Sequence, residues 1–211
     1  MIGRLIARDV RRGLTGAAWL PIAFFLLVAT LMPFAIGPDA ALLGRVAAGA
    51  LWIAALTAAL LPVERLVEPD RAHGILDQLA LRGCAEETVA AAKILAHWLT
   101  FAPLLLLAAV PASALLGMDA LTLLRTEIAL VVGTPGLAAL TVAVAAVTAG
   151  MPRAGSLAGV LVFPLAVPLL IFGAASSGGN SGGLLLEAAV SLLLTAGAPF
   201  AAGAAIRAAR S

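Results

Sequence analysis

The sequence predicts an all-α integral membrane protein with six transmembrane helices. Of its 211 residues, 63% are hydrophobic and only 11% are charged, and the mean hydropathy is +1.11. Soluble domains are about 45–50% apolar and about 25% charged, so a soluble core of this size could not hide so much apolar surface. Six apolar runs are also long enough to cross a bilayer, because about 20 helical residues span its roughly 30 Å of hydrocarbon. Lipid is therefore the expected solvent.

The first element predicted is a short amphipathic helix over residues 1–15. Apolar side chains recur there at helical spacing: Ile2, Leu5, Ile6 and Val10. Basic side chains lie largely off that stripe: Arg4, Arg8, Arg11 and Arg12. Such a segment can lie along the membrane surface with its basic face toward anionic headgroups. The alternative is a solvated basic tail that only sets topology.

The six spans follow in order and form one transmembrane domain over residues 1–211. They are predicted at residues 16–36, 45–63, 91–116, 128–149, 156–175 and 184–205. The first run resembles the apolar part of a signal peptide, but it is about twice the usual length and no convincing cleavage site follows, so it is predicted to be retained. The connections are short except for residues 64–88.

The distribution of Lys and Arg predicts the orientation. With six spans both termini lie on one side, and 11 of the 13 basic residues fall on that side. Only Arg45 and Arg125 fall on the other. The positive-inside rule therefore places both termini and the 64–88 loop in the cytoplasm.

Motifs for enzymatic chemistry are missing from this sequence. It contains no His-Glu-x-x-His, no Gly-x-Ser-x-Gly and no phosphate-binding loop of the Walker type. We therefore expect no catalytic residues, no metal site and no ATP hydrolysis by this chain. The single cysteine, Cys84, excludes an internal disulfide and a Cys-based metal cluster. The pI near 9.5 comes without a basic patch interleaved with aromatics, so nucleic acid is not an expected partner.

Three residues of the spans are candidate contacts for a flat ligand. His97 near the start of the third span can ligate haem iron or contact a carboxylate, or it can be an interfacial histidine beside the belt residue Trp98. Trp52 can stack on a planar ligand or simply pack in the core. Glu187 lies near the outer end of the sixth span, where placement at the interface explains a carboxylate.

The long loop is the densest cluster of charge in the chain. Pro69 is expected to break the polar extension of the second span, and GILDQLAL then reads as a short amphipathic helix with Ile75, Leu76, Leu79 and Leu81 apolar. Asp70 is a candidate cap for its start. A short helix parallel to the membrane suits docking to a soluble partner; the alternative is a surface helix without one.

Several segments, in order along nearly the whole chain, resemble the haem exporter protein B (CcmB) family. They are IGPDAALLGRVAAGALWIAALTAALLPVERL, DRAHGILDQLAL, AAKILAHW, LLGMDA, LVVGTPGLAAL and VFPLAVPLLIFGA. This family supplies permease subunits of the bacterial cytochrome c maturation system. The resemblance implies an ABC-2-type exporter permease fold in the inner membrane, with the N-terminal interfacial helix as its connecting helix.

The resemblance also implies partners and a site. A homodimer would pair with two copies of an ABC ATP-binding subunit, and join a haem-handling membrane protein and a small one-span protein. The 64–88 loop would be the coupling helix, a role that falls on this sequence to Glu64, Arg65, Asp70, His73, Gly74, Asp77 and Gln78. The outer loop ASSGGNSGG is shorter than the family pattern, and Cys84 matches no family motif.

The function expected from these features is export or presentation of haem to the periplasm for c-type cytochromes. Haem is the expected substrate, ATP acts through the partner, and no cofactor is permanently bound. Two alternatives stay open. The chain could be a scaffold that couples ATP hydrolysis to release of a haem-loaded chaperone, or an exporter of another amphiphilic substrate.

Overall fold

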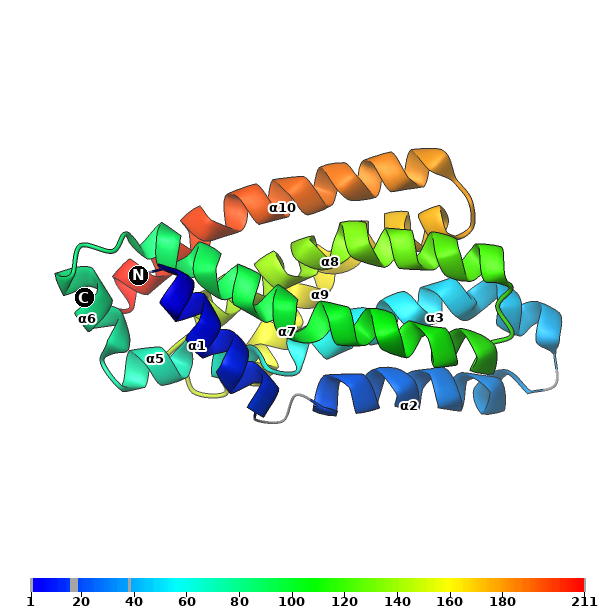
Figure 1. Cartoon of the computed structure of the whole chain (residues 1–211), viewed down its shortest axis with the longest axis horizontal. Coiled ribbons are helices and arrows are strands. Elements are labelled where there is room, and N and C mark those ends of the chain that lie inside the picture. The colour runs from blue at the N-terminus through cyan, green and yellow to red at the C-terminus, as the bar shows by residue number, and fades with distance from the viewer. Residues whose placement is uncertain (1, 16–18, 38, 211) are drawn as a thin grey trace.

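A computed structural model describes residues 2–15, 19–37 and 39–210. Within those ranges the chain is helical and has no strand. Six long helices run side by side along the molecule (Figure 1): α2 (Trp19–Ile36), α3 (Ala40–Leu60), α7 (Glu86–Leu115), α8 (Ala120–Thr148), α9 (Ala154–Ser177) and α10 (Ser181–Ala208). Each is long and apolar enough to cross a membrane, which confirms the predicted six-span class.

Four shorter helices gather at one end of the bundle (Figure 1). They are α1 (Ile2–Thr15), α4 (Val63–Leu66), α5 (Glu68–Ala72) and α6 (Ile75–Leu81), and the last turns of α10 lie beside them. We call this the charged end. The predicted amphipathic helix is present as α1, and its apolar stripe turns toward α7: Leu5 is buried in the core and Ile6 packs against it. Its contact with headgroups stays a prediction.

Most long helices extend beyond the apolar runs that predicted them. α3 begins at Ala40 rather than residue 45, α7 at Glu86 rather than 91, and α8 at Ala120 rather than 128. Hydropathy marks where the membrane begins, whereas helix ends are set by capping, so the predicted starts were too late. Residues 16–18, at which the first span was predicted to begin, lie outside the described residues.

Three helices that begin at the end opposite the charged end have a polar side chain as their N-cap. Asp39 accepts a hydrogen bond from the Leu42 amide at 2.9 Å, and Asp119 accepts one from Thr122 at 2.8 Å. Asn180 does the same for Gly183 at 3.2 Å. Each short polar side chain satisfies one amide that the first turn of a helix leaves without a partner. The turns at this end can therefore be short.

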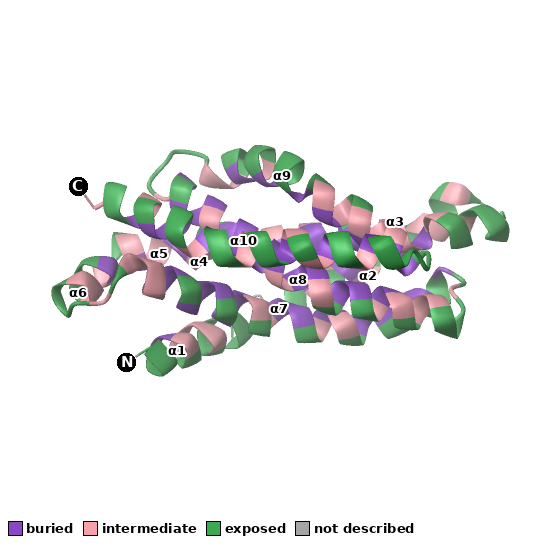
Figure 2. Ribbon diagram, turned by 90° about the horizontal axis from the view of Figure 1, so that it is seen from above, coloured by how far each residue is buried: buried purple, intermediate pink, exposed green. Residues whose placement is uncertain are grey.

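α8 is the centre of the bundle and packs against α3, α7, α9 and α10. Buried residues gather in the centre of the bundle in Figure 2. In the most apolar 18-residue stretch of α8, 72% of the residues are buried inside the protein, against 11% in the corresponding stretch of α2. The largest buried side chain beside it is Trp52 of α3, whose ring fits against Gly133 of α8 and Gly173 of α9. Small residues let helices approach closely in lipid, where apolar burial alone does not drive association.

The contact between Trp52 and Gly173 yields a stability prediction. A methyl group at Gly173 would overlap the indole ring, so Gly173→Ala should destabilise the bundle by about 1–3 kcal/mol through overpacking. Equilibrium unfolding in a denaturing detergent, followed by helical circular dichroism, measures this. Gly49→Ala on α3 is the matched control, because nothing lies within 4 Å of the added methyl group and helix propensity favours alanine. Equal destabilisation by both variants would contradict the packing account.

Candidate functional site

The loop between α3 and α7 folds into three short helices at the charged end. The chain turns at Pro62 after α3, and Val67 is buried between α4 and α5. Pro69 occupies the first turn of α5, where a missing amide hydrogen costs nothing. Gly74 then takes a φ of +66°, a left-handed conformation that glycine adopts without strain, and this reverses the chain into α6. The predicted break at Pro69 is thus the start of α5.

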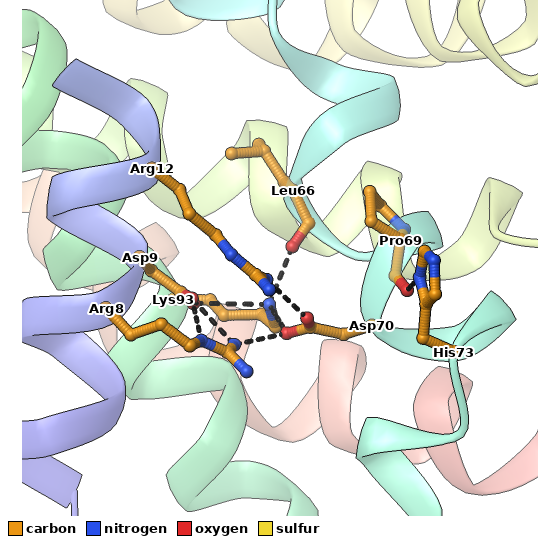
Figure 3. Close-up of polar contacts among 8 residues, drawn as sticks. All are labelled: Arg8, Asp9, Arg12, Leu66, Pro69, Asp70, His73 and Lys93. Atoms are coloured by element: carbon orange, nitrogen blue, oxygen red, sulfur yellow. Dashed lines mark hydrogen bonds and ion pairs between the residues drawn. The ribbon is translucent and has the colours of Figure 1, made fainter. Parts of the chain in front are cut away.

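Asp70 points into the protein and is the centre of a buried charge cluster (Figure 3). Its side chain is only 3% exposed, and Lys93 of α7 is 4% exposed. Lys93 Nζ donates to Asp70 Oδ2 at 2.6 Å, to the Leu66 carbonyl at 2.8 Å and to Asp9 Oδ2 at 3.3 Å. An ammonium group has three protons to donate, and all three have acceptors here.

Two arginines of α1 complete the cluster. Arg8 Nη2 donates to Asp70 Oδ2 at 2.5 Å, and Arg12 Nη1 donates to Asp70 Oδ1 at 3.1 Å. Arg8 Nε also holds Asp9 at 2.7 Å. The cluster therefore ties three separate segments together: α1, α5 and the start of α7 (Figure 3).

The electrostatic balance of the cluster keeps Asp70 ionised. Burial by itself would raise the pKa of the Asp70 carboxyl. Attraction to Lys93 and Arg8, with the hydrogen bonds they donate, outweighs burial and holds the pKa below the ordinary value of 3.8. A charge this deeply buried is stable only with such partners.

These contacts correct one prediction about Asp70. The start of α6 has Gly74 at its cap position and no side-chain cap, so Asp70 does not cap that helix. The prediction assumed that Asp70 precedes a single helix, whereas it lies inside α5. With so little surface, Asp70 can act on a soluble partner only by positioning its neighbours.

Two glutamates of the loop fasten it to the α8–α9 turn. Glu68 accepts a hydrogen bond from the Gly150 amide at 2.7 Å and pairs with Arg71 at 3.0 Å. The hydrogen bonds from Arg71 lower the pKa of Glu68. Glu64 accepts from the Gly155 amide at 2.8 Å, in the first turn of α9. These glutamates supply acceptors for backbone groups that the turn leaves without partners.

The last turn of α10 and Arg210 after it hold α6 and the start of α7 through ion pairs that are exposed or partly buried. Arg210 donates to Asp77 at 2.8 Å and to Glu86 at 2.6 Å. Arg207 donates to Glu87 at 2.5 Å and to Glu86 at 3.3 Å. Exposed pairs contribute little individually, roughly 0–1 kcal/mol, but a network of four keeps the C-terminal turn beside the loop.

One face of the loop stays exposed in the described part of the chain, although Asp77 on it pairs with Arg210. His73, Asp77 and Gln78 are exposed there, and Leu81 is 88% exposed. The predicted apolar stripe of α6 is therefore only partly right, since Leu76 is buried and Ile75 and Leu79 are half-buried, but Leu81 points away. We call these four exposed residues the docking face: His73, Asp77, Gln78 and Leu81. Arg65 and Glu64 are exposed on the neighbouring α4, and Gly74 is half-buried in the turn.

The three candidate ligand contacts are all used inside the bundle. Trp52 is fully buried by protein. The Trp98 indole donates to the Thr134 hydroxyl at 3.1 Å, joining α7 to α8 rather than facing the membrane surface. His97 is 3% exposed, and its Nε2 donates to the Ala59 carbonyl at 3.0 Å. His97 is thus buried by protein, and its place at the membrane interface stays a prediction. Whether any of the three contacts haem stays a prediction.

Glu187 also differs from expectation. It is fully buried, and neither carboxyl oxygen has a hydrogen-bond partner among the described residues. Exposure at the membrane interface therefore does not explain this carboxylate. The side chain lies on the face of α10 that packs toward Gly133 of α8, a direction that hydropathy does not report.

Sequence reasoning missed the partners of the loop. Arg8, Arg12 and Lys93 contact Asp70 across 62, 58 and 23 positions of the chain. Asp9 contacts Lys93 across 84 positions. Helical spacing predicts contacts only between residues of the same helix. The sequence offered one indication of these contacts between segments, which was the opposite charge of the residues involved. Among the described residues no group of histidine, cysteine and carboxylates is arranged to hold a metal ion.

Comparison with known proteins finds one family over nearly the whole chain. The family model described as CcmB protein matches residues 1–209. Heme exporter protein B of Rhodobacter capsulatus is 42% identical over 211 residues, which cover 96% of this chain and 97% of the relative. The protein of the same name in Paracoccus denitrificans is 41% identical with the same coverage. That of Escherichia coli K12 is 42% identical over 193 residues, covering 89% and 88%.

The charge cluster predicts a large effect of one substitution. Asp70→Ala leaves Lys93 buried without its main partner, which costs about 3–5 kcal/mol and should release α1. Trypsin cleavage after Arg12 should then accelerate by roughly 150- to 5,000-fold, since cleavage follows the population of the open state.

Asp77→Ala is the control for this experiment, because its ion pair with Arg210 involves a side chain that is 59% exposed. It should change the cleavage rate by less than about fivefold. If the two variants are cleaved equally fast, the buried cluster does not hold α1 in place.

Proposed function

The chain belongs to the CcmB protein family, and from this premise we propose that it is the permease subunit of an ATP-driven ABC complex that moves haem toward the periplasm for c-type cytochromes. The relatives that support this carry the name heme exporter protein B and align over most of both chains. Haem is thus the proposed substrate and not a resident cofactor.

The energy for this movement is proposed to come from a separate ATP-binding subunit. The sequence contains no phosphate-binding loop, and a permease without one needs an external source of energy. The family resemblance supplies the proposed stoichiometry of two permease chains and two ATP-binding subunits. A haem-handling membrane protein and a small one-span protein are the further proposed partners.

The charged end is proposed to face the cytoplasm of a cell with the chain in its inner membrane. Basic residues concentrate there, with 11 of 13 on the predicted cytoplasmic side. The turn with Arg153 is held to the same end by Glu64 and Glu68. An ATP-binding subunit would meet the permease at this end.

The docking face is the proposed contact with the ATP-binding subunit. Leu81 is 88% exposed and lies outside the six apolar spans, and exposed apolar surface rimmed by polar residues is typical of sites that contact a protein or a membrane. His73, Asp77 and Gln78 supply that polar rim. Glu64, Arg65 and Gly74 flank it, as the coupling role requires.

Asp70 is proposed to transmit movement rather than to touch the partner. A push on α6 reaches α5 directly, and the cluster links α5 to α1 and to Lys93 at the start of α7. Separating these charges would leave one of them buried and unpaired, so the three segments should move as a unit. The ATPase stroke would thereby tilt α7, which crosses the membrane.

The docking face can be tested by one substitution. Leu81→Asp places a charge where the partner should cover an apolar side chain, and should weaken binding of the ATP-binding subunit by about 1–2 kcal/mol, roughly five- to thirtyfold. Co-purification of the two subunits at several salt concentrations measures the loss. Leu121→Asp, an exposed leucine at the start of α8, is the control and should leave recovery unchanged. If both variants recover equally little of the ATP-binding subunit, the docking face is not its contact site.

The transport role can be tested with the whole complex in sealed vesicles. We expect haem to accumulate across the membrane when ATP is supplied on the side of the charged end, and not with a non-hydrolysable analogue. The complex with Leu81→Asp should accumulate haem more slowly, because this substitution weakens binding of the ATP-binding subunit. ATP-stimulated release of a haem-loaded chaperone without accumulation would replace transport by the scaffold function.

A further inference from the structure

A cavity of about 370 Å³ lies where the bundle meets the charged end. Its walls come from α1, the first turn of α2, the α3–α4 turn, α4, α5 and the first half of α7. This volume falls within the range of small-molecule pockets, roughly 300–1,000 Å³. Neither the packing of the 64–88 loop nor that of the core accounts for a cavity of this size.

The polar side of the cavity carries excess positive charge. Arg12, Arg65 and Lys93 line it together with Asp9 and Asp70. Both carboxylates are already neutralised, because Asp70 accepts from Lys93, Arg8 and Arg12, and Asp9 accepts from Arg8 and Lys93. Three cationic groups of the lining thus face two carboxylates, which Arg8 also contacts from outside the lining. Arg65 is exposed, and no carboxylate of the described residues pairs with it.

The other side of the cavity is apolar. Pro21, Ala96 and Phe101 line it, and the Phe101 ring lies beside the buried His97 ring with centroids 4.8 Å apart. The Nε2 of His97 is engaged by the Ala59 carbonyl, and its Nδ1 is buried without a partner among the described residues. The cavity therefore combines a cationic mouth with an apolar wall, which fits a ligand that is anionic at one end and apolar at the other.

The position of the cavity along the bundle indicates that the ligand is a membrane lipid, which is abundant at that depth. Pro21 is the third residue of the first span, and Arg12 lies on α1 before that span begins. The cavity is thus at the level where headgroups meet acyl chains. Basic pockets between transmembrane helices on the cytoplasmic side bind the headgroups of anionic lipids.

We propose that this cavity binds an anionic phospholipid, with the phosphodiester at Arg65 and Arg12 and the start of the acyl chains along Phe101. The lipid would bridge α1 and the coupling segment, so it would stabilise the arrangement that the charge cluster maintains. The inference rests on the proposed cytoplasmic placement of the charged end, but it requires neither haem nor the ATP-binding subunit.

Binding can be measured on the purified full-length chain by native mass spectrometry in a mild detergent. Equal amounts of phosphatidylglycerol and phosphatidylcholine are offered, and we expect phosphatidylglycerol to be retained preferentially. Arg65→Gln should lower that retention about fivefold, as the loss of one cationic contact worth about 1 kcal/mol implies. Arg65→Lys should restore it, and Arg82→Gln, an exposed arginine outside the cavity, should have no effect.

Two competitors identify the source of the anion. Soluble glycerol 3-phosphate should not displace the lipid at equal concentration, because it lacks the apolar part. Displacement by glycerol phosphate would show a phosphate site and overturn the lipid assignment. Displacement by haem at equal concentration, or equal retention of both lipids in the unsubstituted chain, would overturn it as well. A failure of haem transport in vesicles leaves these outcomes unchanged, so the two proposals fail separately.

Discussion

The buried ion pair between Asp70 and Lys93 is the interaction on which the charged end depends. Lys93 belongs to a span, whereas Asp70 belongs to the loop, and both are almost fully covered by protein. Each would be unstable alone, because a buried charge needs a partner of opposite sign. Arg8, Arg12 and Asp9 of α1 complete the set. One electrostatic requirement therefore decides how three distant segments lie together.

The rest of the bundle is held by a different kind of contact. All the ion pairs of the described residues lie at the charged end, whereas the spans pack through small residues around α8. Trp52 between Gly133 and Gly173 is the clearest such contact. The result is a stiff, charge-linked end joined to spans without ionic links to one another. Such a division suits a permease that receives force at one end.

Two sets of residues of the loop turn in different directions. Asp70, Glu64 and Glu68 turn inward and fasten the loop to α1, α7 and the α8–α9 turn. The docking face turns outward. This division explains why so short a segment carries so much charge: most of it stabilises the loop against its own protein. The cavity beside Arg65 lies between the two sets, so a bound lipid would contact the same helices that the proposed ATPase moves.

The sequence by itself determined the number of spans, the amphipathic α1, the side on which charge gathers and the family. The first three follow from composition or from spacing along one helix, and the family follows from the resemblance of whole segments. None of the four depends on which helices are neighbours. Only the tertiary structure decided that Asp70 is buried, that Leu81 is exposed and that Glu187 lies inside the bundle. A side chain's surroundings depend on the direction in which its helix is turned against others. Hydropathy is nearly uniform around α10, so it carries no record of the direction in which Glu187 points.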